Sequence, residues 1–270
     1  MNNIFTTILG FSKEVIDKWR VIYELTRRNF QSQYTGSYLG FVWVFLQPLL
    51  FISVLYFVFT FGFRTRPSGD YPFSVYLISG MIAWLFFSNN LSSCTHVIRE
   101  FSFLVKKVDF RLSILPIVKL SSSLITHLFF VAIALIVALV SGISVNFYFF
   151  QIFYYMIAMN FLLLGLGWIT SSTSIFVKDI GNIVTVVIQF GFWLTPIFWN
   201  IELISTKYQW IIKLNPMYYI VTGYRDSIIY KVPFWVKPYE TMYYWCLTLF
   251  VLFSGMVIFR RLKPHFAEVV

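Results

Sequence analysis

Long segments without a single Asp, Glu, Lys or Arg constrain the fold of this chain more than any other feature. They cover residues 30–63, 71–98, 120–177, 180–201 and 241–259. About 20 apolar helical residues cross the hydrocarbon core of a bilayer. The segment 120–177 is too long for one crossing, and its cluster Ser141-Gly142-Ile143-Ser144-Val145-Asn146 is typical of a turn. The pattern therefore predicts an all-α membrane protein with six transmembrane helices.

We expect one transmembrane domain over residues 1–270, with spans at residues 37–63, 72–97, 117–140, 147–175, 180–200 and 241–259. The composition agrees, because 59% of the residues are hydrophobic and only 12% are charged, against about 45–50% and 25% in soluble domains. This excludes a soluble enzyme, a disordered chain and a coiled-coil rod. Cys94 and Cys246 are too few for a disulfide framework and lack metal-ligand spacing, so we expect no metal site.

The basic residues predict the orientation. With six spans, fourteen Lys and Arg fall on the side of both termini and seven on the other. Lys and Arg concentrate in cytoplasmic loops, which places both termini in the cytoplasm of a multi-pass inner (plasma) membrane protein. The net charge of +10 is thus mainly a topology signal, and we expect no nucleic-acid partner. The first 30 residues contain Glu14, Asp17 and Glu24 and no uninterrupted apolar region, so no cleavable signal peptide is predicted.

Residues 10–30 have the helical spacing of an amphipathic interface helix with a basic polar face. Such a helix either anchors the lead-in to the first span or docks a cytoplasmic partner. Residues 99–113 mix charges with aromatic side chains. They fit a short protruding helix that binds a partner, or a solvated connector.

Residues 202–238 lie on the outer side and are rich in Tyr and Trp. They are predicted to form two short helices broken at Asn215-Pro216, because the residue before a proline is disfavoured in the α region. A re-entrant helix pair at the mouth of a pathway fits this stretch, and an interfacial aromatic belt explains part of it.

No span carries an ionisable side chain in its interior except His127, which suits either helix packing or function. Ion-coupled carriers usually place such a group at membrane depth, so the driving energy is expected to enter elsewhere. The chain has no GxxxxGK[ST] phosphate loop. We therefore predict no catalytic residue and no bound cofactor in this chain.

Hydroxyl and amide side chains cluster at three predicted cytoplasmic helix ends, residues 88–96, 121–127 and 170–174. They either bond back to helix carbonyls or line a wet vestibule for a hydroxyl-rich or phosphorylated solute.

Several motifs follow one another in a familiar order. They are Arg28 with Tyr34-Thr35-Gly36-Ser37-Tyr38-Leu39-Gly40-Phe41-Val42-Trp43, Leu104-Val105-Lys106-Lys107-Val108-Asp109-Phe110-Arg111, Leu194-Thr195-Pro196-Ile197-Phe198-Trp199, and Leu214-Asn215-Pro216-Met217 with Tyr224-Arg225-Asp226. Over essentially the whole chain this resembles the ABC-2 type permeases that export polysaccharides such as O-antigen, capsule and teichoic acid. Arg111 stands where that family usually has proline.

The resemblance implies a homodimer of six-span subunits with two separate ATPase subunits, which would bind ATP and Mg. It also implies a lipid-linked polysaccharide substrate and contact with membrane lipids. Residues expected to couple to the ATPase are Glu100, Phe103, Lys106, Lys107, Asp109, Phe110 and Arg111. Those expected at the cytoplasmic entrance are Arg28, Tyr34, Ser37, Gly40 and Trp43. Those expected at the external gate are Asn215, Pro216, Tyr218, Tyr219, Tyr224 and Arg225.

Three other interpretations stay open. In these, the chain would be an ABC-2 permease for a drug or haem, a passive channel, or a membrane-embedded transferase acting on lipid-linked sugars. The transferase would need His96, His127, Asp179 or Asp226 in a cavity.

Overall fold

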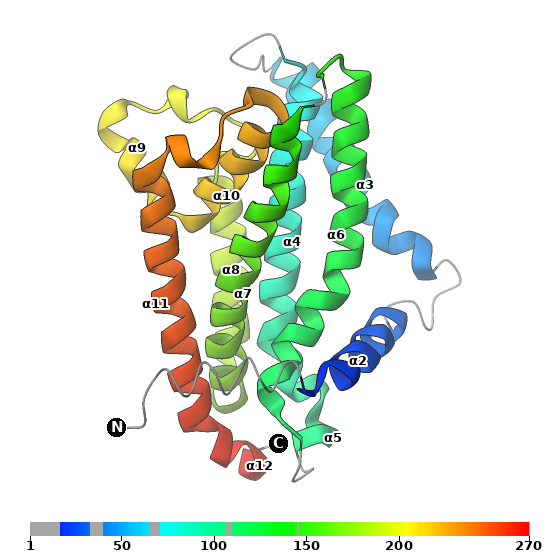
Figure 1. Ribbon diagram of the computed structural model, residues 1–270, viewed down its shortest axis with the longest axis vertical. Helices are drawn as coiled ribbons and strands as arrows, with labels where there is room; N and C mark the ends of the chain where they lie inside the picture. The colour runs from blue at the N-terminus through cyan, green and yellow to red at the C-terminus, as the bar shows by residue number, and fades with distance from the viewer. Residues whose placement is uncertain (1–16, 33–39, 65–70, 106–109, 145, 270) are drawn as a thin grey trace.

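The computed structural model describes residues 17–32, 40–64, 71–105, 110–144 and 146–269 of the chain. Within these ranges the secondary structure is helical, and no strand occurs. The long helices are α3 (Gly40–Phe57), α4 (Phe73–Glu100), α6 (Leu115–Val140), α7 (Gln151–Phe176), α8 (Asp179–Leu194) and α11 (Pro238–Leu262). In Figure 1, α4, α6, α7, α8 and α11 run along the long axis of a bundle.

Five segments of the described chain are long and apolar enough to cross a membrane: Val42–Gly62, Phe73–Glu100, Leu112–Val140, Phe147–Phe176 and Pro238–Val269. The predicted span at 180–200 is represented by α8, which is apolar but has only 16 residues, about 24 Å of helix. The helix ends at Leu194 rather than at residue 200, because Thr195 precedes Pro196 and adopts an extended backbone conformation.

The uncharged segment 120–177 divides into two helices. Gly142 has a positive φ of 84° in the turn that follows α6, a conformation that glycine adopts without strain. The short 3₁₀ helix Phe147–Phe150 then leads into α7. The turn cluster at residues 141–146 therefore acts as the sequence indicated.

The core of the bundle is formed by α4 and α7. Helix α7 contacts α4, α6, α8, α10 and α11. At its crossing with α11, a Cβ built on Gly255 would lie 2.4 Å from the Gly165 carbonyl oxygen, so the two backbones meet directly, as small residues allow in membrane bundles. Among the described side chains of α3 only Ile52 is buried, and the others are half-buried or exposed, so its apolar surface requires lipid or another chain as a cover.

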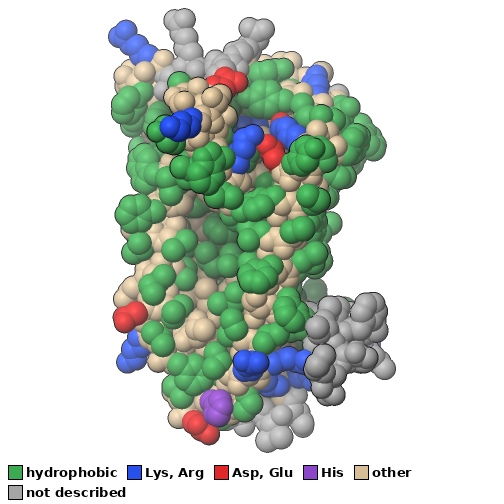
Figure 2. Space-filling model, turned by 90° about the vertical axis from the view of Figure 1, so that its left-hand side faces the viewer, with side chains coloured by type: hydrophobic (Ala, Val, Ile, Leu, Met, Phe, Trp, Pro, Cys, Tyr) green, Lys and Arg blue, Asp and Glu red, His purple; other side chains and the backbone are tan. Residues whose placement is uncertain are grey.

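The two ends of the bundle differ. One end, the α5 end, carries α2 (Trp19–Ser32), α5 (Ser102–Val105) and α12 (Phe266–Val269). The other, the α10 end, carries α9 (Thr206–Lys213) and α10 (Pro216–Arg225) (Figure 1). Figure 2 shows that the charged side chains visible on one face gather toward these ends, with a largely hydrophobic zone between them. This distribution suits a bundle that spans a bilayer.

Candidate functional site

A polar cavity of about 410 Å³, here called the α4–α6 pocket, opens between α3, α4 and α6. Its polar lining comprises Asn89, Asn90, Ser92, Ser93, Lys119, Ser122, Ser123, Thr126 and His127, and its apolar lining comprises Val44, Pro48, Ile82, Leu85, Phe86 and Phe130. The lining combines hydroxyl and amide groups with aromatic and aliphatic groups, which suits a solute that has both kinds of surface.

Two of the three hydroxyl clusters identified in the sequence meet in this pocket. The hydroxyl of Ser123 donates a 2.5 Å hydrogen bond to the Asn90 side-chain oxygen and so joins α6 to α4. The third cluster, residues 170–174, serves helix packing instead. Ser172 and Thr173 bond back to carbonyls of their own helix, and Ser174 donates to the Thr95 carbonyl of α4.

A buried lysine connects three helices at the α5 end. The ammonium of Lys119 lies 2.7 Å from the Glu100 carboxylate and 2.8 Å from the Asn29 side-chain oxygen. The Asn29 amide in turn donates a 2.6 Å hydrogen bond to Ser122. We call these four residues the Lys119 junction. It ties α2, α4 and α6 together at Glu100, within the segment predicted to contact an ATPase.

The residues predicted to couple to an ATPase are only partly described. Glu100 belongs to the Lys119 junction, and Phe103 on α5 is exposed. Phe110 is half-buried and packs against the clusters of apolar side chains around Leu104 and Ile22, while Arg111 is exposed. Lys106, Lys107 and Asp109 lie outside the described residues. The coupling role stays a prediction.

The residues predicted to form the entrance are only partly described. Arg28 is exposed on α2, and Trp43 is exposed on α3. Gly40 begins α3, whose Val44 and Pro48 reach the α4–α6 pocket. Tyr34 and Ser37 lie outside the described residues. An entrance role for this group is therefore untested.

At the α10 end, α9 ends at Lys213 and α10 begins at Pro216. Asn215 caps α10 by accepting a hydrogen bond from the Met217 backbone N–H, and it donates to Thr195 beyond the end of α8. Asparagine at this position and proline at the next are both favoured at helix starts. The remaining predicted gate residues, Tyr218, Tyr219, Tyr224 and Arg225, are buried on α10.

Arg225 supplies hydrogen-bond donors to the backbone at the break where α8 ends. Its guanidinium donates to the carbonyl oxygens of Pro196 at 2.6 Å and Ile197 at 2.5 Å, and it lies 3.5 Å from the centre of the Tyr76 ring. The break leaves these carbonyls without helical donors, and buried carbonyls require a partner. Arg225 therefore holds α10 against both α4 and the end of α8.

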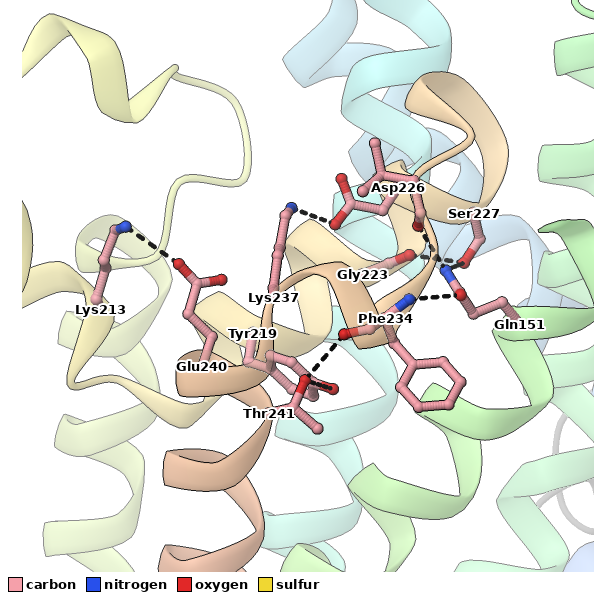
Figure 3. A network of polar contacts seen from close by, with 11 residues as sticks. Gln151, Lys213, Tyr219, Gly223, Asp226, Ser227, Phe234, Lys237, Glu240 and Thr241 are labelled. Atoms are coloured by element: carbon pink, nitrogen blue, oxygen red, sulfur yellow. Dashed lines mark hydrogen bonds and ion pairs between the residues drawn. The ribbon is translucent and has the colours of Figure 1, made fainter.

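A second polar network follows α10 (Figure 3). Asp226 is buried and pairs with Lys237. Burial raises the pKa of the Asp226 carboxyl above its ordinary value, and the Lys237 ammonium opposes that rise. The Gln151 side chain accepts from the Phe234 backbone N–H at 2.8 Å and donates to the Val232 carbonyl at 3.0 Å, which fastens this segment to the start of α7.

The α4–α6 pocket is connected to α10 through His127. Its ring nitrogen Nε2 lies 2.8 Å from the Tyr224 hydroxyl, and its ring packs against Phe86 at 4.4 Å between centroids. Both His127 and Tyr224 are buried. A side chain of the pocket wall thus contacts α10.

Nothing in the sequence marked the Lys119 junction or the carbonyl contacts of Arg225. Glu100 and Lys119 are separated by a loop, and Asn29 lies 90 residues from Lys119, so linear spacing gives no signal for their meeting. Within the described ranges, no three His, Cys, Asp or Glu side chains assemble into a group that could hold a metal. Of the four candidate residues for a transferase, His96 and Asp179 are exposed, whereas His127 and Asp226 each line a cavity.

The sequence model of the ABC-2 type transporter family matches residues 20–229. The chain is 25% identical over 250 residues to an "O-antigen export system permease protein RfbA" of Klebsiella pneumoniae, covering 91% of this chain and 93% of that protein. It is 26% identical over 258 residues to a protein of the same name in Myxococcus xanthus, covering 92% and 94%.

Proposed function

Because this chain belongs to the ABC-2 type transporter family, we propose that it is the membrane-spanning permease subunit of an ATP-driven exporter of lipid-linked polysaccharide. The observation that carries the proposal is the match to O-antigen export permeases over more than nine-tenths of both chains. The described spans and the polar pocket between them suit a permease.

The proposed topology has six crossings, with α8 as the short fifth one. Both termini lie in the cytoplasm of the inner membrane, so the α5 end is the cytoplasmic end. The helices α9 and α10 form a re-entrant external gate, fastened to α4 and α8 by Arg225. The excess of Lys and Arg on the side of the termini supports this orientation.

Energy is proposed to come from ATP hydrolysis in two separate subunits, which hold the ATP and Mg. Residues 99–113 dock on them, and α2 flanks the contact. The Lys119 junction supports this assignment, because Glu100 lies near the start of the docking segment and is bonded through Lys119 to α2 and α6. Movement of the segment would then reach two other helices.

The working unit is proposed to be a homodimer. Helix α3 is apolar, and only Ile52 among its described side chains is buried, which leaves a surface that a second copy, as well as lipid, can cover. The α4–α6 pocket supports a hydroxyl-rich substrate, because a sugar left without hydrogen-bond partners in an apolar setting costs about 1–3 kcal/mol for each unpaired group. Arg28 and Trp43 lie on the α2 and α3 side, from which a lipid-linked glycan would enter.

The proposal is tested by deleting the gene in its host and following the glycan. Loss of the chain should leave lipid-linked polymer inside the cell and abolish its display at the surface, and the plasmid-borne gene should restore display. Undiminished display in the deletion strain would contradict the proposal and favour a drug or haem permease. Alanine substitutions at His96, His127, Asp179 and Asp226 test the transferase alternative. If the chain is a transferase, these variants should alter the chemical structure of the glycan instead of retaining the glycan inside the cell.

A further inference from the structure

The α10 end contains a second cavity, of about 230 Å³, which shares no lining residue with the α4–α6 pocket. Tyr76, Glu202, Tyr218, Thr222, Asp226 and Tyr230 contribute to its lining, and we call it the tyrosine pocket. Its volume is below the roughly 300–1,000 Å³ typical of drug-sized ligands. It therefore suits a single small polar unit.

The pocket wall is formed by α10 and by the π-helical turn Asp226–Tyr230 that continues it. Turns of this kind inside helices are frequent at functional sites. The opposite wall comes from the start of α4 and from the segment that follows α8. Arg225 joins these two walls through its hydrogen bonds to the Pro196 and Ile197 carbonyls, which fixes their relative position.

Charge balance indicates which ligand the pocket fits. Two cations line it, and both are engaged: Arg225 with backbone carbonyls and the Tyr76 ring, and Lys237 with Asp226. The carboxylates of Asp226 and Glu202 match these two positive charges. A phosphate or a uronic acid would thus meet no surplus positive charge, and a divalent cation would have to displace Lys237 from Asp226.

The remaining chemistry is that of sugar recognition. The phenol rings of Tyr218 and Tyr230 provide flat faces for the C–H surface of a pyranose. The Tyr76 ring lies under the Arg225 guanidinium, and its hydroxyl donates to the Trp199 carbonyl. Glu202 is exposed and accepts a 2.9 Å hydrogen bond from Asn200, with a second carboxylate oxygen to accept from a ligand. Thr222 and the partly exposed Tyr230 add hydroxyls. Charged acceptors give the stronger hydrogen bonds to hydroxyl groups.

We propose that the tyrosine pocket binds one neutral sugar residue of a glycan at the outer end of the permease. This inference rests on the proposed function, which supplies both the orientation of the pocket and the glycan that it binds. The pocket would hold the glycan beside the α9–α10 gate as the glycan leaves the permease.

The test uses the purified complex of this chain with the subunits it assembles with, in lipid nanodiscs. Saturation-transfer NMR with methyl glycosides of neutral hexoses and deoxyhexoses measures binding, with glucuronate and inorganic phosphate as the alternative probes. At least one neutral glycoside should bind. Tyr230→Ala should weaken its binding about tenfold, equivalent to about 1.4 kcal/mol, and Glu202→Gln should weaken it severalfold. Tyr230→Phe should retain most of the binding, which separates ring stacking from a folding defect.

Tyr239→Ala and Glu268→Gln are the matched controls, because both residues are well exposed and lie outside the pocket. Both should bind as the unaltered complex does. Absence of binding by every neutral glycoside, preference for phosphate or glucuronate, or equal binding by all variants would overturn the inference. ATP-dependent glycan export by the same complex is measured in parallel. Export without sugar binding overturns only the pocket, whereas sugar binding without export overturns only the proposed function.

Discussion

The Nε2 atom of His127 on α6 lies 2.8 Å from the Tyr224 hydroxyl on α10. One residue lines the α4–α6 pocket, and the other belongs to the helix at the opposite end of the bundle. Both side chains are buried, so neither has water as an alternative partner. The hydrogen bond therefore couples the position of α10 to the wall of the pocket.

Removing one partner of this hydrogen bond should destabilise the chain. Tyr224→Phe and His127→Phe should each lower the free energy of unfolding by about 1–3 kcal/mol, because the remaining polar group stays buried and unpaired. The double variant should lose less than the sum of the two. Thermal unfolding in detergent checks the cycle, with Tyr239→Phe as an exposed control. Strict additivity would show that the two side chains do not interact.

The Lys119 junction should transmit motion from the α5 end. Lys119→Met removes the contacts to Glu100 and Asn29. Each hydrogen bond to a charged group contributes about 1.5–3 kcal/mol to stability, so their loss should loosen the junction. Glycan export per ATP hydrolysed should then fall in a complex that still assembles. Lys207→Met, at the other end of the bundle, is the control. Normal coupling in the Lys119 variant would remove the junction from the mechanism.

The α7–α11 crossing should tolerate no side chain at its glycines. Gly255→Ala places a Cβ 2.4 Å from the Gly165 carbonyl oxygen, and overpacking of this kind costs about 1–3 kcal/mol. Gly62→Ala meets nothing within 4 Å and should be neutral or slightly stabilising. Thermal unfolding of the two variants distinguishes them, and equal midpoints would contradict the direct backbone contact.

Arg225 should be irreplaceable by lysine. The guanidinium serves two carbonyls and the Tyr76 ring at once, whereas an ammonium lacks the planar fork that does so. Arg225→Lys should therefore release the segment after α8. Hydrogen–deuterium exchange in residues 195–201 should become about tenfold faster for each 1.4 kcal/mol by which the free energy of local opening falls. Unchanged exchange there, measured against Lys207→Met, would show that Arg225 does not hold the break closed.

The helices could be predicted because charges and turns mark their limits. The gap in charge between Asp70 and Arg99 locates α4, and Gly142 marks the end of α6. Pro216, the first residue of α10, marked the start of that helix. The length of α8 was overestimated because apolar residues continue beyond Thr195, although the backbone leaves the helix there.

The site was only partly predictable, for a physical reason. Hydroxyl clusters in the sequence predict polar helix faces, but they do not show whether a face lines a pocket or bonds to a neighbouring backbone. Residues 121–127 contribute to the pocket lining, whereas hydroxyls of the cluster at residues 170–174 donate hydrogen bonds to backbone carbonyls. Pairs such as Lys119 with Asn29 depend on helix packing, which no local spacing in the sequence encodes.

The most direct test of the central claim is transport in proteoliposomes that contain this chain with or without its ATPase subunits. We predict that lipid-linked glycan crosses the bilayer only when the ATPase subunits and Mg-ATP are both present, and that an ion gradient has no effect. Accumulation of glycan by the chain alone, driven by a proton or sodium gradient, would contradict the account.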